Sequence, residues 1–203
     1  MFPFDVILFD VGGVLLTNGW DHRERAAVLD QFHLDRAEFE ARHATQNDAW
    51  ERDAISVKEY LEATVFYVPR SFSQDDFLDA ICAQSKLLDD GALGILGELA
   101  VSEKCMLGVL NNEARATNEY RFGTFGIRDH LKVAFSSCYV GLRKPGSAIY
   151  LRALDILGVR PERVLFIDDR EENTVAAEAV GMKAIQFQGA AALRSELAKL
   201  GVM

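Results

Sequence analysis

The chain has 203 residues, of which 49% are hydrophobic and 26% are charged, and its formal net charge at pH 7 is −9. This length and composition are typical of a globular protein with room for one domain and an insertion. The acidic balance argues against nucleic acid or an anionic membrane as the main partner, and no apolar run reaches the length of a membrane span, so we expect a cytoplasmic protein.

The first predicted strand covers residues 4–10, FDVILFD, and is almost wholly apolar, as a strand buried on both faces should be. It delivers Asp10 into a turn that contains Gly12 and Gly13. Backbone amides of such a turn can face an anion as a nest. This stretch is therefore the first candidate for a functional site.

A long segment of helical patterns follows, with no convincing strand. Four helices are predicted in it, and Ser56 and Ser73 each begin the pattern of a capping box. We therefore expect a small all-helical domain, here called the helical insertion, over residues 17–90. It would interrupt a core formed by residues 1–16 and 91–203.

From residue 91 onward, helical and strand patterns alternate. The predicted strands are residues 104–112, 133–137, 163–169 and 183–187. Each crossover between neighbouring parallel strands needs a connecting segment, which is usually a helix. The alternation therefore predicts an α/β fold with a doubly wound, Rossmann-like parallel sheet.

Three strands end in polar side chains, which are Asp10, then Asn111 and Asn112, then Asp168 and Asp169. Ligands of parallel α/β sheets bind beyond the carboxyl ends of the strands, so we expect these groups to meet. Converging carboxylates repel each other, and Mg²⁺, which prefers oxygen ligands, relieves that repulsion. An aspartate in such a site can also attack phosphorus and become an aspartyl-phosphate.

The stretch GLRKPG, residues 141–146, offers a cation to the same site. Lys144 stands just before a predicted helix, and Pro145 is placed near its first turn, where proline is tolerated. A lysine beside the carboxylates would complete a clamp on a phosphoryl group.

Taken in order, four stretches resemble the motifs of the haloacid dehalogenase superfamily: FDVGGVL with Asp10, GVLNN with Asn111, RKP with Lys144, and FIDD with Asp168 and Asp169. The resemblance covers nearly the whole chain, and the helical insertion resembles the small helical cap of that superfamily. Within it, the sequence is most similar to the branch that contains the glucose-1-phosphate phosphatases and the N-terminal phosphatase domain of soluble epoxide hydrolase.

The resemblance implies that Asp10 is the nucleophile and a ligand of Mg²⁺, the expected cofactor. Gly12 would lend a backbone carbonyl to the metal, Asp169 would be a direct ligand, and Asp168 would be its neighbour. Lys144 would pair with Asp10 and with the phosphoryl oxygens.

The resemblance also implies contacts with the substrate, a small phosphorylated metabolite such as a sugar phosphate. Asn111 would donate its amide to the phosphate, where the family usually has a hydroxyl. Further phosphate or substrate contacts are expected from Gly13, Asn112, Trp20 and His22. No nucleic acid or membrane partner is expected, and a homodimer is left open.

Gly12 is the main departure from the family pattern, because most family phosphatases have an aspartate there that protonates the leaving group. A general acid contributes roughly 10²–10⁴ in rate, so its loss favours substrates with good leaving groups, such as anomeric sugar phosphates and aryl phosphates. Alternatively, the helical insertion supplies the acid from Asp21, His22 or Glu24.

Two other functions are compatible with the sequence. Gly12 and Asn111 also fit a weak or inactive relative that binds a phosphorylated ligand or a protein. Haloacid dehalogenation is less favoured, because that branch places a bulky residue after its nucleophile and needs no metal. The stretch DVGGVL and the double acid favour the metal-using branch instead.

Overall fold

The computed structural model describes residues 2–203, in which five strands form one parallel sheet. The strands are β1 (Val6–Phe9), β2 (Met106–Asn111), β3 (Val133–Ser136), β4 (Val164–Asp168) and β5 (Lys183–Gln186). Their order across the sheet is β3-β2-β1-β4-β5. The chain therefore adds β2 and β3 on one side of β1 and then crosses over to add β4 and β5 on the other side. The predicted doubly wound sheet is confirmed, and its order switches at β1, where ligands bind in such folds.

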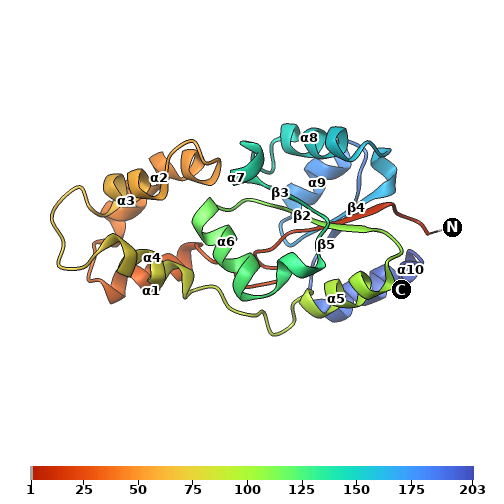
Figure 1. Ribbon diagram of the computed structural model, residues 1–203, viewed down its shortest axis with the longest axis horizontal. Coiled ribbons are helices and arrows are strands. Elements are labelled where there is room, and N and C mark those ends of the chain that lie inside the picture. The colour runs from red at the N-terminus through yellow and green to blue at the C-terminus, as the bar shows by residue number, and fades with distance from the viewer. Residues whose placement is uncertain (1) are drawn as a thin grey trace.

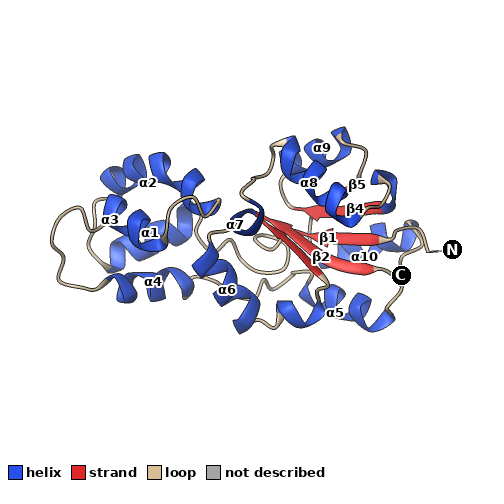
Figure 2. Cartoon of the chain, turned by 45° about the horizontal axis from the view of Figure 1, so that its top comes forward, coloured by secondary structure: helices blue, strands red, loops and turns tan. Residues whose placement is uncertain are grey.

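Helices cover both faces of the sheet (Figures 1 and 2). They are α5 (Leu93–Ser102), α6 (Arg115–Thr124), α8 (Ser147–Leu157), α9 (Glu171–Ala179) and α10 (Ala190–Lys199). Ile7 and Phe9 of β1 share an apolar core with α5, α6 and α10, whereas Leu8 belongs to a second core with α8 and α9. Because successive side chains of a strand point to opposite faces, β1 is buried from both sides.

Four helices between β1 and α5 form a separate cluster at one end of the sheet (Figure 1). They are α1 (His22–Gln31), α2 (Arg36–Glu51), α3 (Val57–Thr64) and α4 (Gln74–Cys82). Aromatic side chains fill the interior of this cluster, where the rings of Trp50 and Tyr60 stack 3.9 Å apart and Phe39 and Phe77 are buried. The helical insertion thus has an apolar core of its own.

The starts of these helices follow from their capping side chains. Asp21 accepts a hydrogen bond from the N–H of His22, and Ser56 and Ser73 form complete capping boxes. Such a cap contributes about 0.5–2 kcal/mol. The helix ends are less predictable, since α3 stops at Thr64 although its apolar pattern runs on for several residues.

Some local features differ from the sequence-based expectation. Helix α8 begins at Ser147 with Gly146 as its N-cap, so Pro145 precedes the helix instead of lying in its first turn. The short helix α7 (Ser137–Val140) was not predicted, because one turn carries no helical periodicity. The structure also contains the 3₁₀ turns η1 (Ile127–His130) and η2 (Pro161–Arg163). Across residues 2–203, no helix combines the length and the apolar character needed to cross a membrane.

Candidate active site

Adjacent strands bring the predicted acids together. Phe9 of β1 pairs with Ile167 of β4, so Asp10 and Asp168 leave the sheet side by side. Asp10, Asp168 and Asp169 each offer a carboxylate oxygen, and these oxygens all lie within 4.8 Å of one another. Three carboxylates at this separation repel one another unless cations lie among them.

Lys144 supplies one such cation from the loop before α8. Its Nζ is 2.9 Å from Oδ1 of Asp10 and 2.5 Å from Oδ2 of Asp168, and only 4% of the residue is exposed. Burial lowers the pKa of Lys144, but the two carboxylates outweigh burial and raise it above the usual value of lysine. Burial raises the pKa of Asp10, although Lys144 opposes the change. One lysine therefore does not offset the cost of burying these acids.

Asp168 and Asp169 differ in what they contact. Asp168 is fully buried and accepts hydrogen bonds from Nδ2 of Asn173, at 3.0 and 3.1 Å, and from the N–H of Arg170, at 2.9 Å. Asp169 has a buried Oδ1 that accepts no hydrogen bond from any described residue. Because a cation would satisfy that oxygen, the residues fit Mg²⁺, which Asp10 and Asp169 would hold through their carboxylates, with Asp168 beside them.

The two glycines after Asp10 lie in different surroundings. Gly12 lines the pocket described below, and its N–H donates to no acceptor among the described residues. Gly13 does not line the pocket, and its N–H donates to the carbonyl of Leu16 at 2.8 Å, so the expected phosphate contact through Gly13 is not supported. An ideal Cβ on Gly13 would lie 2.3 Å from Oδ2 of Asp169, and its φ is +73°. Glycine at position 13 therefore lets the backbone approach Asp169 closely.

The two asparagines at the end of β2 point in different directions. Asn111 is buried outside the pocket, where its Nδ2 donates to Asn118 and its Oδ1 accepts from Ser136, at 2.9 and 2.7 Å. The expected contact of the Asn111 amide with a phosphate is therefore not supported by the structure. Asn112 does line the pocket, but both ends of its amide bond the backbone of Lys144. Its side chain holds the lysine loop instead of presenting a donor to the substrate.

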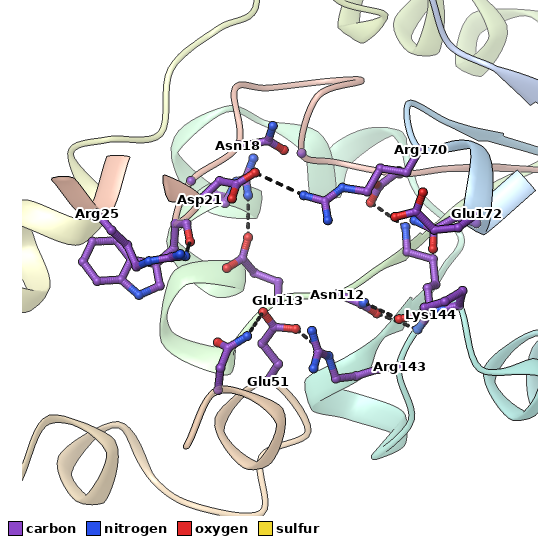
Figure 3. A pocket seen from close by; sticks show the side chains of 18 residues that line it. Asn18, Asp21, Arg25, Glu51, Asn112, Glu113, Arg143, Lys144, Arg170 and Glu172 are labelled. Atoms are coloured by element: carbon purple, nitrogen blue, oxygen red, sulfur yellow. Dashed lines mark hydrogen bonds and ion pairs between the residues drawn. The ribbon is translucent and has the colours of Figure 1, made fainter. Parts of the chain in front are cut away.

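A pocket of about 280 Å³ opens where the carboxyl ends of the strands face the helical insertion (Figure 3). Trp20 and Asp21 line it from the insertion, whereas His22 and Glu24 do not. His22 is exposed on α1, so the expected substrate contact is not supported. Asp21 uses Oδ1 as the N-cap of α1 and accepts a hydrogen bond at Oδ2 from Arg170, at 3.2 Å.

Several charged residues of the pocket were missed by the sequence analysis. They are Arg25, Glu51, Arg121, Arg143, Arg170 and Glu172. For two of them the sequence does contain an indication, because each is adjacent to a motif residue. Arg143 directly precedes Lys144, and Arg170 directly follows Asp169. The others come from helices, whose orientation toward the site depends on packing that the sequence pattern does not reveal.

Ion pairs join the helical insertion to the sheet around the pocket. Arg143 lies 3.3 Å from Asp48 and 2.7 Å from Glu51, both on α2. Arg170, which follows β4, pairs with Asp21 across the same opening (Figure 3). Burial raises the pKa of Glu51, although Arg143 opposes the change. The insertion is thus held against the loops that carry Lys144 and Asp169.

The amino-acid sequence matches the family model of haloacid dehalogenase-like hydrolases over residues 4–181. It is 39% identical over 82 residues to flavin mononucleotide hydrolase 1 of Arabidopsis thaliana, covering 37% of this chain and 34% of that protein. It is 35% identical over 74 residues to bifunctional epoxide hydrolase 2 of Rattus norvegicus, covering 36% of this chain and 13% of that protein. The matched segments thus span about a third or less of these curated relatives.

The fold is also similar to a solved structure, a HAD-family enzyme of Bacteroides thetaiotaomicron in complex with magnesium and inorganic phosphate. The TM-score is 0.70 at 19% identity, and the match covers 92% of this chain and 95% of that chain. At this identity the likeness shows a common fold, while the family model covers most of the sequence and all four predicted motifs. The chain belongs to the haloacid dehalogenase-like hydrolase family.

Proposed function

We propose that this protein is a Mg²⁺-dependent phosphatase that hydrolyses a small, polar phosphorylated metabolite, such as a sugar phosphate, through a phosphorylated Asp10. The observation that carries the proposal is the meeting of Asp10, Lys144 and the donor-free Oδ1 of Asp169 beside one pocket. The mononucleotide hydrolase among the relatives, and the magnesium and phosphate bound by the Bacteroides enzyme, support the same chemistry.

In the proposed reaction, a carboxylate oxygen of Asp10 attacks phosphorus while the bond from phosphorus to the leaving oxygen breaks. Lys144 orients Asp10 and faces the negative charge of the phosphoryl group, and the free N–H of Gly12 is a further donor. Bound Mg²⁺ would neutralise part of the charge of the transferring group. Water then releases phosphate from Asp10 and restores its carboxylate.

The pocket favours a polar substrate. Among the described residues that line it, only Trp20 and Pro145 have apolar side chains, whereas Arg25, Glu51 and Arg143 are charged. An apolar substrate would strip water from these charged groups without replacing its hydrogen bonds, which is costly. The hydroxyls of a sugar can donate to a carboxylate and accept from a guanidinium. The volume of about 280 Å³ also suits a small metabolite.

We interpret the helical insertion, residues 17–90, as a cap over an active site built by residues 1–16 and 91–203. Support comes from the pocket, which both parts line, and from the ion pairs that Arg143 and Arg170 make with the insertion. In this interpretation the cap contributes most of the contacts to the part of the substrate beyond its phosphate.

The test is a panel of phosphate esters assayed with Mg²⁺ and with EDTA, using sugar phosphates, a mononucleotide and a terpenyl phosphate. We expect Mg²⁺-dependent phosphate release by the wild type, fastest with sugar phosphates, and by Asp155→Asn, which changes an exposed acid of α8. Asp10→Asn should release no phosphate. Mass spectrometry of quenched wild-type enzyme should find a phosphoryl group on Asp10.

Other outcomes would contradict the proposal in different ways. Phosphate release by Asp10→Asn would exclude Asp10 as the nucleophile. Binding of phosphate esters without turnover would support the non-catalytic alternative. Release of fluoride from fluoroacetate without phosphatase activity would support dehalogenation.

A further inference from the structure

The side chain that Gly12 lacks would enter a part of the pocket where two other residues already lie. An ideal Cβ on Gly12 would be 2.8 Å from Oδ1 of Asn18 and 3.9 Å from Nη1 of Arg121. All three residues line the pocket. Asn18 and Arg121 therefore border the space into which a side chain of residue 12 would project.

Asn18 has an amide that is free to bind a ligand. It is partly exposed and makes no hydrogen bond with any other described residue. A side-chain amide carries two N–H donors, and a half-turn of its terminal group exchanges the positions of its oxygen and nitrogen. Its NH₂ can therefore face an oxygen in the pocket at the place where Gly12 offers no side chain.

Arg121 brings a fixed positive charge to the same place. This residue of α6 is 2% exposed, its Nη1 pairs with Glu113, and its Nη2 donates to the carbonyl of Thr17 at 2.6 Å. Its Nε has no partner among the described residues. An ideal Cβ on Gly19 would lie 3.2 Å from Nη1, so the absence of a side chain there leaves room for the guanidinium. The charge is held in position before any substrate arrives.

We propose that Asn18 and Arg121 stabilise the departing oxygen of the substrate with N–H donors and positive charge, in place of the proton that Gly12 cannot supply. The inference rests on the proposed phosphatase function. In Figure 3, Asn18 lies across the pocket from Lys144, the residue that pairs with Asp10. An oxygen that leaves in line with attack by Asp10 departs toward that side of the pocket.

The bonding changes need no acid. The oxygen of Asp10 bonds to phosphorus, the bond from phosphorus to the leaving oxygen breaks, and its electron pair stays on that oxygen. The oxyanion is held by the N–H groups of Asn18 and Arg121 and takes a proton from water after it leaves. Glu113 is not the missing acid, because its two oxygens already accept hydrogen bonds from Thr117 and Arg121. Preorganised donors of this kind are an established means of stabilising developing charge.

The first experiment measures kcat/KM in Mg²⁺ for a series of aryl phosphates of differing phenol acidity and for one alkyl phosphate. Asn18→Ala should lose about tenfold or more with the alkyl phosphate but less than about threefold with para-nitrophenyl phosphate, because a nitrophenolate needs little stabilisation. Asn47→Ala is the matched control, since Asn47 is also a half-buried asparagine that lines the pocket. It should change all substrates by a similar factor.

Arg121 needs a second variant, because removing it alone leaves Glu113 buried without its partner. Arg121→Gln combined with Glu113→Gln removes both charges and should also lose most activity with the poorest leaving groups. Arg121→Lys, which keeps the charge, should recover part of that loss. Folding of each variant is checked by thermal denaturation.

Three outcomes would overturn the inference. An equal loss for all leaving groups in Asn18→Ala and in the double variant would mean that these residues act only on structure. A selective loss in Asp21→Asn, with disappearance of the fall in rate at high pH from the pH–rate profile, would mean that the insertion supplies a proton. If the wild type hydrolyses no phosphate ester and Asp10 is never phosphorylated, the proposed function fails and this inference fails with it.

Discussion

The side chain of Asn112 hydrogen-bonds both backbone polar groups of Lys144: its Oδ1 accepts from the N–H and its Nδ2 donates to the carbonyl, each at 2.9 Å. Asn112→Ala removes both bonds and leaves the charged groups of the site in place. We expect kcat to fall by about 10- to 100-fold, the loss typical when a residue that orients a metal ligand is removed, because Asn112 orients Lys144 in a comparable way. The measurement is steady-state kinetics with the best substrate of the panel.

A double-mutant cycle tests whether Asn112 acts through Lys144. Once Lys144→Met has removed the ammonium, adding Asn112→Ala should cost little further activity, because residues that act as one unit are not additive. If the two losses multiply instead, Asn112 touches the substrate directly.

Lys144 also contributes to stability, because it lies between two buried carboxylates. Lys144→Met should lower the free energy of unfolding by about 3–5 kcal/mol in EDTA, since it leaves Asp10 and Asp168 without their cation. Mg²⁺ should restore more stability to this variant than to the wild type, because the metal replaces the missing charge. Urea unfolding with and without Mg²⁺ measures both effects. Lys183→Met, an exposed lysine of β5, is the control, and an equal gain from Mg²⁺ in Lys144→Met and wild type would contradict the prediction.

The sequence could place the side chains that parallel strands bring together. Asp10 and Asp168 each follow or end an apolar run, and the parallel register puts the ends of neighbouring runs side by side. Two neighbouring residues at the end of β2, Asn111 and Asn112, show the limit of this reasoning. Because side chains alternate across a strand, Asn112 reaches the lysine loop while Asn111 turns away toward Ser136.

The charged residues from helices could not be predicted in the same way. Glu51 is one of many polar residues of α2, and only the placement of the whole insertion turns it toward Arg143. That placement depends on contacts between segments about ninety residues apart. Arg121 lies on a mainly polar helix, and no pattern distinguishes it from a solvated arginine, although the structure buries it beside Gly12.

Gly13 should control the affinity for Mg²⁺ through Asp169. In Gly13→Ala the new Cβ would lie 2.3 Å from Oδ2 of Asp169, and the residue would have to keep a φ of +73°. We expect the dissociation constant for Mg²⁺ to rise by about tenfold or more, because Asp169, the proposed ligand, must move. Gly12→Ala is the matched control, since its φ is not left-handed and its Cβ meets the movable end of Asn18. Isothermal titration with Mg²⁺ alone compares the two, and equal affinities would contradict the prediction.

A hydrogen-bond chain links the pocket wall to the interior of the helical insertion. Nε1 of Trp20 donates to Oη of Tyr60 at 3.1 Å, and that oxygen lies 2.8 Å from Nδ1 of His43. If Tyr60 donates its hydroxyl proton, Nδ1 is an acceptor and the imidazole is neutral. Burial, assisted by Arg25, lowers the pKa of His43 to about 4.

This pKa predicts how the stability depends on pH. An unfolded histidine has a pKa near 6.5, so the unfolded chain binds the proton first as the pH falls. The stabilisation is fully present above about pH 6.5 and is lost between about pH 6.5 and 4, up to roughly 3 kcal/mol. His43→Gln should therefore lose less stability than wild type between pH 7 and pH 5 in urea unfolding. The same loss in both proteins would exclude His43 as the source.

An aspartate at position 12 should return proton transfer to the pocket. Its Cβ would lie 2.8 Å from Oδ1 of Asn18. Gly12→Asp alone would therefore displace the amide of Asn18 while it adds a carboxyl group that can donate a proton. Gly12→Asp with Asn18→Ala should hydrolyse alkyl phosphates about 10- to 100-fold faster than Asn18→Ala, with little change for para-nitrophenyl phosphate. The pH–rate profile should gain a fall at high pH, where the new carboxyl group loses its proton. Gly12→Asn with Asn18→Ala is the control of equal size, and an equal gain in that variant would mean that position 12 lacks a hydrogen-bond donor, not a proton.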